Sequence, residues 1–203
     1  MNFQLCSNRE IHNGRDLQLK LLAHKALNVN ISGEVRLKHI YAAVEIVNEE
    51  KGSRVRIEPA EEFSYDIKVD FNSRVLGVQN AQWDSSVAYQ NEIGVCRTFV
   101  FFHEIEFLFK NGLVKGGDVD NAIVIVEHPV TKEQVDDMSR LFDVPALEVR
   151  EDGYLSNLVL RFPNECARHK LLDLIGDLRL CGGFLKAKVT AEKAGHGINT
   201  AAA

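Results

Sequence analysis

The chain has 203 residues with a formal net charge of −5, and 45% of its residues are hydrophobic. Its length fits one domain or one and a half, and its composition is ordinary for a water-soluble globular protein with a buried core. The acidic balance argues against a general nucleic-acid binder, whose electrostatic footprint is usually basic, and no apolar run approaches the roughly 20 residues that cross a bilayer.

The first part of the chain reads differently from the rest, and residues 1–38 are interpreted as an atypical N-terminal remnant. Within this part, the apolar spacing over residues 16–27 predicts a short amphipathic helix. From Ile40 onward the pattern becomes that of β-strands. Alternating segments at 41–47 and 54–57, separated by a turn, predict a hairpin, and residues 63–71 predict a third strand with strict period two.

The middle of the chain mixes helical and strand patterns. Residues 72–91 are polar and irregular, which predicts a surface loop. The apolar residues at 98–111 fit a helix that ends at Gly112. Residues 121–126 form a continuous apolar run typical of a buried strand, and residues 131–142 predict an amphipathic helix that opens with a capping pattern.

The last predicted elements alternate between strands and a helix. Residues 158–162 predict a strand, a helix containing His169 follows, and residues 184–190 predict another strand. Strands, a helix, strands, a helix and a strand together favour an α+β fold, in which a β-sheet packs on helices as one pair of layers.

The most informative motif lies in the predicted helix at residues 168–177. His169, Asp173 and Asp177 are four residues apart and therefore line up along one face of a helix with about 3.6 residues per turn. A neutral imidazole and a carboxylate one turn apart can bind the same small cation, and zinc commonly takes such ligands. The second carboxylate can orient a neighbouring group or move a proton. Taken alone, this spacing also fits a solvated helix face with an internal hydrogen bond.

A further histidine, His196, lies between Gly195 and Gly197. Glycine on both sides lets the backbone bend tightly and expose the ring. Together with the motif on the predicted helix, this histidine indicates hydrolytic metal chemistry.

The four cysteines, Cys6, Cys96, Cys166 and Cys181, are scattered without CxxC spacing. We interpret them as reduced and mostly buried thiols rather than a disulfide framework or a cysteine-based zinc site. The N-terminus also lacks the basic start and apolar core of a secretory signal. Both observations favour a cytoplasmic location.

Four segments, in order, resemble a family of zinc hydrolases, and the motif HKxxDxxGD within them is highly specific. The segments are residues 97–99, 116–124, 168–177 and 195–199. They are similar to the UDP-3-O-acyl-N-acetylglucosamine deacetylases of lipid A biosynthesis in Gram-negative bacteria.

This resemblance implies a domain organisation. Residues 39–203 would correspond to the second of the family's two similar domains. The extra segment at about 126–153 would be a small inserted β/α subdomain. That segment looks like the insertion of the form that is fused to a hydroxyacyl carrier-protein dehydratase.

The resemblance also implies a cofactor, Zn²⁺, and catalytic roles. His169 and Asp173 would be two of three protein ligands of the zinc. His196 would stabilise the oxyanion and protonate the leaving amine, and Asp177 would orient it. Thr98 would hydrogen-bond the tetrahedral intermediate.

The implied substrate is a UDP-linked acyl amino sugar. Lys170 would contact its polar head, and Phe99 would pack near the sugar. Gly116 and Gly117 belong to the matching region between residues 102 and 126 that would wall the passage for the acyl chain. Alone, such a glycine pair more often simply permits a turn.

One part of the family's pattern has no counterpart at an equivalent place, namely the first-domain glutamate that acts as general base and the zinc-ligating histidine after it. Glu127 and His128 imitate this pair by letter, but they follow the predicted buried strand and precede Pro129. His103 is similarly placed beside a glutamate but does not complete HExxH. We therefore expect a weak or inactive isolated chain, with a separate first-domain polypeptide as its implied partner.

Three hypotheses for function remain at this point. The first is a zinc-dependent deacetylase of the nucleotide-linked acyl amino sugar, as a truncated or split enzyme. The second is an inactive relic that binds the sugar nucleotide or the acyl chain without turnover. The third is a structural module whose exposed face pairs with a partner chain. Metal content and activity distinguish them.

Overall fold

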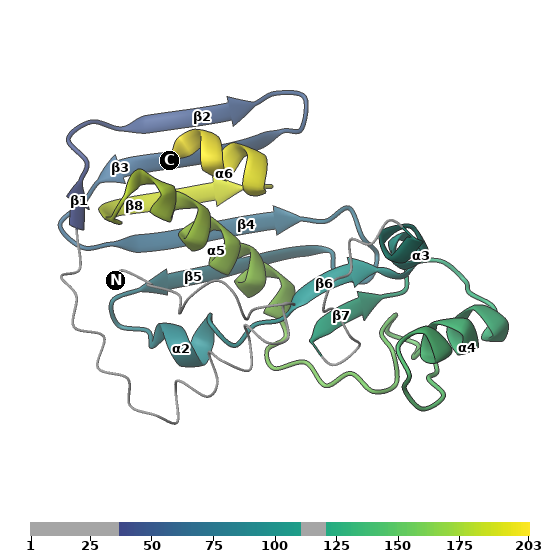
Figure 1. Cartoon of the computed structure of the whole chain (residues 1–203). Helices are drawn as coiled ribbons and strands as arrows, with labels where there is room; N and C mark the ends of the chain where they lie inside the picture. Colours follow the sequence, from purple (N-terminus) through teal and green to yellow (C-terminus); the bar gives the residue numbers. More distant parts are fainter. Residues whose placement is uncertain (1–36, 111–120) are drawn as a thin grey trace, which may run out of the picture. The chain divides into compact units, whose positions relative to one another are not determined.

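The protein is described by a computed structural model, which covers residues 37–110 and 121–203 (Figure 1). These residues form two compact units. The first runs to Arg97 and resumes at Leu160, and the second comprises the chain from Thr98 to Val159. The insertion expected at about 126–153 lies within the second unit, which begins earlier in the chain. No helix in the described ranges is long and apolar enough to span a membrane.

The first unit is built on a mixed sheet in which β8 occupies the centre. On one side, β8 pairs antiparallel with β3, which pairs antiparallel with β2. On the other side, β8 pairs parallel with β4, which pairs antiparallel with β5. The short β1 adds a parallel pairing to the start of β8. The strands are β1 (Leu37–His39), β2 (Val44–Asn48), β3 (Ser53–Pro59), β4 (Ser64–Asp70), β5 (Val78–Asp84) and β8 (Phe184–Glu192).

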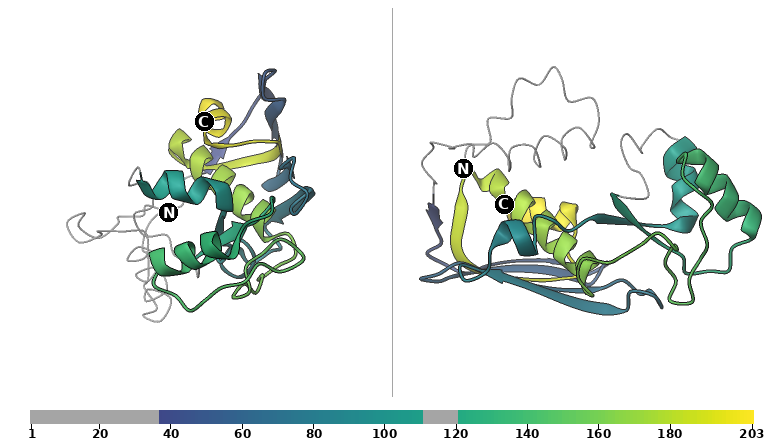
Figure 2. Two further views of the ribbon diagram at one scale, coloured as in Figure 1. Left: turned by 90° about the vertical axis from the view of Figure 1, so that its right-hand side faces the viewer. Right: turned by 90° about the horizontal axis from the view of Figure 1, so that it is seen from below.

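The helices of this unit lie on one face of the sheet, as Figure 2 shows for α2, α5 and α6. Alternating residues of the central strands point to that face and are buried, with polar residues between them on the other face. Their apolar side chains form one core with the inward side of α5. The helices are α2 (Tyr89–Glu92), α5 (Glu165–Asp177), the 3₁₀ turn η1 (Leu178–Cys181) and α6 (His196–Ala202).

The packing of α5 on the sheet predicts a large effect for Leu171→Ala. Leu171 is fully buried in the core, so truncation removes apolar contacts and leaves a cavity. We expect the free energy of unfolding to fall by about 2–5 kcal/mol, measured by urea denaturation. Leu180, in η1, is 72% exposed, and Leu180→Ala is the matched control with an expected change within about 0.5 kcal/mol. Equal effects of the two substitutions would contradict this packing.

The second unit contains a parallel strand pair joined by a helical crossover. Strand β6 (Thr98–Phe101) pairs parallel with β7 (Ala122–Ile125), and α3 (Phe102–Lys110) follows β6 directly. Helix α4 (Lys132–Leu141) begins with a complete capping box. The Thr131 hydroxyl accepts from the Gln134 N–H at 3.3 Å, and the Gln134 side chain accepts from the Thr131 N–H at 2.8 Å. Apolar residues of these elements form a separate small core.

The structure confirms the predicted α+β class and most of the predicted elements. The hairpin appears as β2 and β3, the period-two segment as β4, and the apolar run at 121–126 as β7. The capped helix is α4, the helix with His169 is α5, and the strand predicted at 184–190 is β8. The helix predicted at residues 16–27 lies outside the described residues. So does Gly112, the predicted end of the helix at residues 98–111.

Three predictions about local structure were wrong. Residues 72–91 contain β5 and α2 instead of a continuous loop. The helix predicted from residue 98 begins only at Phe102, because residues 98–101 form β6. Residues 158–162 form no strand, since Val159 is 80% exposed and the Leu158 N–H donates locally to the Leu155 carbonyl.

Candidate functional site

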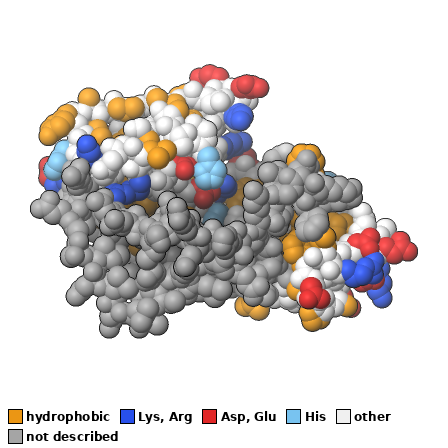
Figure 3. Space-filling model, viewed as in Figure 1, with side chains coloured by type: hydrophobic (Ala, Val, Ile, Leu, Met, Phe, Trp, Pro, Cys, Tyr) orange, Lys and Arg blue, Asp and Glu red, His pale blue; other side chains and the backbone are white. Residues whose placement is uncertain are grey.

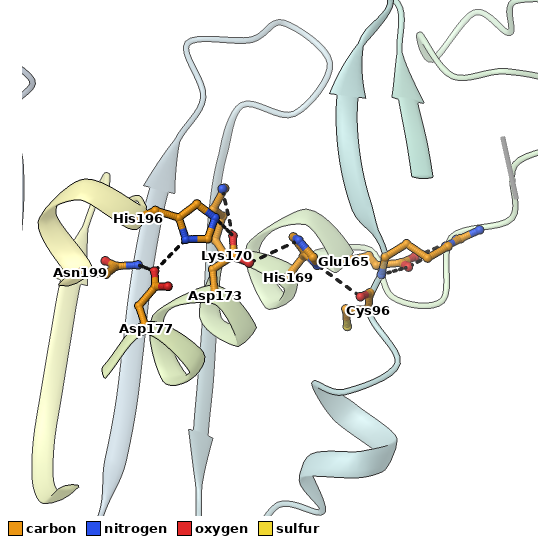
Figure 4. A network of polar contacts seen from close by, with 9 residues as sticks. Cys96, Glu165, His169, Lys170, Asp173, Asp177, His196 and Asn199 are labelled. Atoms are coloured by element: carbon orange, nitrogen blue, oxygen red, sulfur yellow. Dashed lines mark hydrogen bonds and ion pairs between the residues drawn. The ribbon is translucent and has the colours of Figure 1, made fainter. Parts of the chain in front are cut away.

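Helix α5 presents a line of four polar side chains at four-residue spacing: Glu165, His169, Asp173 and Asp177. The apolar positions between them, including Leu171 and Leu174, are buried against the sheet. This burial fixes the rotation of the helix, so the polar line runs along a different edge. The spacing read from the sequence therefore does bring His169, Asp173 and Asp177 onto one edge of a helix (Figure 4).

His169 is oriented by contacts from both of its ring nitrogens. Its Nδ1 lies 3.3 Å from the carbonyl oxygen of Cys96, and its Nε2 lies 3.5 Å from Asp173 Oδ1. A carbonyl can only accept, so the ring donates Nδ1–H to it, which leaves the Nε2 lone pair available in the neutral ring. Burial lowers the pKa of His169 more than the nearby Asp173 carboxylate raises it. The lowered pKa favours a neutral imidazole, and the contact with the Cys96 carbonyl favours the tautomer that can act as a metal ligand.

Asp173 lies at the centre of the cluster and contacts three of its side chains. Its Oδ2 lies 3.1 Å from Lys170 Nζ and 3.9 Å from His196 Nε2, while Oδ1 faces His169. The side chain of Asp173 is only 10% exposed, so the Lys170 ammonium and the two imidazoles supply most of its polar surroundings. Lys170, predicted to contact substrate, therefore also holds this carboxylate.

His196 begins α6 and points toward the last turn of α5, where it meets Asp177. Its Nδ1 lies 2.8 Å from Asp177 Oδ2, and the same oxygen accepts from Asn199 Nδ2 at 2.9 Å. The His196 side chain is 67% exposed, while Asn199 is buried. Figure 3 shows histidine atoms beside acidic atoms on the surface over these two helices. Asp177 thus fixes one ring nitrogen and leaves the other directed toward Asp173.

The side chains in this cluster fit the donor chemistry of zinc. His169 offers Nε2 as a ligand atom, while its other ring nitrogen, Nδ1, contacts the Cys96 carbonyl. A metal-bound histidine usually donates its second ring N–H to such an acceptor. Asp173 offers a carboxylate oxygen on the same edge. In residues 37–110 and 121–203, however, no group of three or more His, Cys, Asp or Glu side chains could hold a metal ion. The described part of the chain therefore offers a pair of donors.

The remaining predicted residues lie elsewhere in the chain. Thr98 and Phe99 belong to β6 of the second unit, where Phe99 stacks edge-on against Phe101 at 6.4 Å between ring centroids. Gly116 and Gly117 lie outside the described residues. The structure thus joins His169, Lys170, Asp173, Asp177 and His196 in one cluster, and the roles assigned to all these residues stay predictions.

Two alternatives from the sequence can be located as well. His103 and His128 both lie in the second unit, are exposed, and have ring centroids 6.0 Å apart. Cys96 and Cys166 are buried free thiols, and burial raises their pKa values to about 11 and about 12. These thiols therefore stay protonated near neutral pH, which agrees with a packing role.

Sequence reasoning missed the groups that support the cluster. The Cys96 carbonyl has no side-chain signal at all, because its role depends on where the backbone passes α5. Asn199 lies within the matching segment 195–199, where the sequence predicts no role for it, although it donates a hydrogen bond to Asp177. Glu165 was not singled out, yet it is the most buried acidic residue of the described chain and binds Arg97. Its place four residues before His169 was the available signal.

Comparison with known proteins identifies the family. The family model described as "LpxC: UDP-3-O-acyl N-acetylglycosamine deacetylase" matches residues 19–139 and 144–203. A relative from Bacteroides thetaiotaomicron, named bifunctional enzyme LpxC/FabZ, is 41% identical over 160 residues, which is 79% of this chain and 35% of that protein. A UDP-3-O-acyl-N-acetylglucosamine deacetylase from Helicobacter hepaticus is 35% identical over 161 residues, which is 79% of this chain and 45% of that protein.

The chain belongs to the UDP-3-O-acyl-N-acetylglucosamine deacetylase family. A second bifunctional LpxC/FabZ, from Porphyromonas gingivalis, is 38% identical over 156 residues, which is 77% of this chain and 34% of that protein. The chain thus spans between about a third and just under half of the length of these curated relatives.

Proposed function

We propose that this chain contributes the zinc-binding pair and the acid group of a deacetylase that hydrolyses the N-acetyl group of UDP-3-O-acyl-N-acetylglucosamine. The observation that carries the proposal is the cluster of His169, Asp173, Asp177 and His196 from two helices, in a chain of this family. Such a cluster combines a neutral imidazole, a shielded carboxylate and a second imidazole held by its own acid.

His169 and Asp173 would hold the zinc. The Cys96 carbonyl keeps the ring in the tautomer that leaves Nε2 for the metal, and Lys170, 3.1 Å from Asp173 Oδ2, orients that carboxylate. Bound zinc supplies Lewis-acid chemistry, since it polarises a carbonyl and lowers the pKa of water to about 7.

His196 and Asp177 would form the acid that completes the reaction. The Asp177 carboxylate, 2.8 Å from Nδ1, accepts a hydrogen bond from this nitrogen and fixes the orientation of the ring. The Nε2–H of that ring can then donate to a developing oxyanion and, as the C–N bond breaks, transfer its proton to the leaving amine. Because the ring is 67% exposed, it remains accessible to a substrate from solvent.

The third zinc ligand and the general base are proposed to come from the domain that the longer relatives carry beyond the matched part. The proposal rests on the donor pair His169 and Asp173 and on the share of the relatives' length, 35% and 45%, that this chain spans. A chain alone with two protein ligands should hold zinc weakly and turn over slowly.

The test measures zinc affinity and acetate release for the chain alone and with a first-domain polypeptide taken from a relative. We expect weak zinc binding and near-background acetate release alone, with tighter zinc binding and clear acetate release when both are present. Tight zinc binding by this chain alone, or acetate release by this chain alone, would contradict the need for a further domain. If both samples bind substrate but neither binds zinc nor releases acetate, the hypothesis of an inactive binding relic would be favoured over that of an enzyme.

A further inference from the structure

Glu165, in the first turn of α5, is a buried carboxylate that accepts four hydrogen bonds. Arg97 donates three of them, from its backbone N–H at 3.0 Å, from Nε at 2.9 Å and from an Nη at 3.0 Å. The backbone N–H of Arg161 donates the fourth at 2.7 Å. The Glu165 side chain has no exposed surface, and the Arg97 side chain is 9% exposed.

The two segments held by this carboxylate are the two places where the chain leaves and re-enters the first unit. Arg97 is the last residue before the second unit begins at Thr98, and Arg161 follows the return at Leu160. Arg161 also donates from its guanidinium to the Val95 carbonyl, which ties the two segments to each other. One acidic side chain therefore gathers both connections against the start of α5.

The same contacts set the position of the Cys96 carbonyl. Cys96 lies between Val95, which accepts from Arg161, and Arg97, which is bound by Glu165. With both neighbours fixed, the Cys96 carbonyl is held 3.3 Å from His169 Nδ1, one helical turn along α5 from Glu165. The orientation of the His169 ring thus depends on a backbone segment whose ends are anchored by hydrogen bonds.

We propose that Glu165 is a positioning residue, which fixes both chain connections and, through the Cys96 carbonyl, the tautomer and orientation of His169. It acts at a distance from the reacting groups and is not a catalytic residue. The part that concerns metal affinity rests on the proposed function, whereas the part that concerns the connections and the tautomer does not.

Physical chemistry favours this role over simple packing. A buried ion pair adds little stability compared with apolar residues of similar volume, because removing both charges from water costs several kcal/mol per ion. The charged pair instead adds directional hydrogen bonds. Four N–H donors fix the Glu165 carboxylate, and two of them belong to the backbones of the two connecting segments. Burial raises the pKa of Glu165, but its hydrogen bonds outweigh this and leave that pKa below its usual value.

The experiment compares Glu165→Gln with the wild type by NMR of the full chain. The amide N–H groups of Arg97 and Arg161 are expected to exchange with solvent at least about tenfold faster, since each loses an ionised acceptor. The His169 ring, read at pH 8 from its nitrogen chemical shifts, is expected to change from a single Nδ1–H form to a mixture of both neutral tautomers. Its zinc affinity is expected to fall about 10- to 100-fold.

Glu92→Gln is the matched control. The Glu92 carboxylate also forms an ion pair with α5, through Arg168 at 2.7 Å. The contact of Glu92 with the Cys96 thiol is made by its backbone carbonyl, which the substitution keeps. The control should leave the amide exchange at Arg97 and the His169 tautomer as in the wild type. Equal effects of the two substitutions would overturn the proposal, because general loss of a charge pair on α5 would then explain them.

A second variant covers the case in which Glu165→Gln does not fold. The double variant Arg97→Met with Glu165→Met replaces the buried pair by apolar side chains, which proteins often tolerate. A folded double variant with a mixed His169 tautomer supports the positioning role, and one with the wild-type tautomer overturns it. If wild-type protein binds no zinc, the proposed function fails while the exchange and tautomer results still decide the role of Glu165.

Discussion

Replacing His196 by alanine is expected to lower kcat of the proposed two-part deacetylase about 100- to 10,000-fold, the range that a positioned acid usually contributes. In the proposed reaction, His196 would give the leaving amine a proton from Nε2, and Asp177, 2.8 Å from Nδ1, would hold the ring in place. KM should change little, since the group acts mainly on the transition state. The measurement is the rate of acetate release at saturating substrate.

The control for this prediction is His39→Ala, because His39 is an exposed histidine on β1 outside the cluster. It should retain the wild-type rate. The His196→Ala protein should also keep its free energy of unfolding within about 0.5 kcal/mol, since its side chain is 67% exposed. A folded His196→Ala protein with wild-type kcat would contradict the acid role.

Replacing His169 by alanine is expected to abolish detectable zinc binding, with a loss of affinity of more than about 100-fold. Removing a direct ligand should cost more than the 10- to 100-fold typical of losing an outer supporting partner. Asp173 would remain as a single carboxylate whose nearest cation is Lys170. Competition with a fluorescent zinc chelator measures the change.

His128→Ala is the matched substitution for this second prediction. His128 follows a glutamate, as the first-domain ligand of the family does, but it lies in the second unit beside His103. Zinc affinity should stay at the wild-type value in His128→Ala. If affinity instead fell with His128→Ala and survived His169→Ala, the assignment of the ligand pair would be wrong.

The strands that the sequence predicted well are those with clear alternation, and the missed strand shows the limit. In β4, apolar residues alternate strictly, so the strand is evident from the sequence. In β5, the inward position before Ala81 and Trp83 is Gln79. Its side chain accepts from the Ala167 N–H in the first turn of α5 at 3.3 Å. A polar residue used to cap a distant helix breaks the pattern that marks a strand.

The region after Arg97 shows how tertiary pairing overrides a local pattern. Aromatic and β-branched residues at 98–101 fit a strand as well as a helix, and the parallel register with β7 decides between them. The local residue pattern could not reveal the partner strand β7, which lies more than twenty residues further along the chain. The apolar residues at 158–162 lacked any such partner among the described strands and formed no ladder.

The site was predictable where it depends on helical spacing and not where it depends on backbone position. The four-residue spacing placed His169, Asp173 and Asp177 on one edge of α5. Helical spacing could not place His196, which lies in another element and whose Nδ1 is 2.8 Å from Asp177. The Cys96 carbonyl could not be predicted, because every residue has a carbonyl and only the fold selects one.

The central position of β8 has a consequence for synthesis on the ribosome. The hairpins β2–β3 and β4–β5 are complete by Asp84, but β8, the strand that joins them, begins only at Phe184. At typical translation rates of about 5–20 residues per second, the interval lasts roughly 5–20 seconds. During that time two ribbons with unpaired edges wait in the nascent polypeptide, and such edges are templates for aggregation. Efficient production of this protein should therefore depend on chaperones that shield emerging chains.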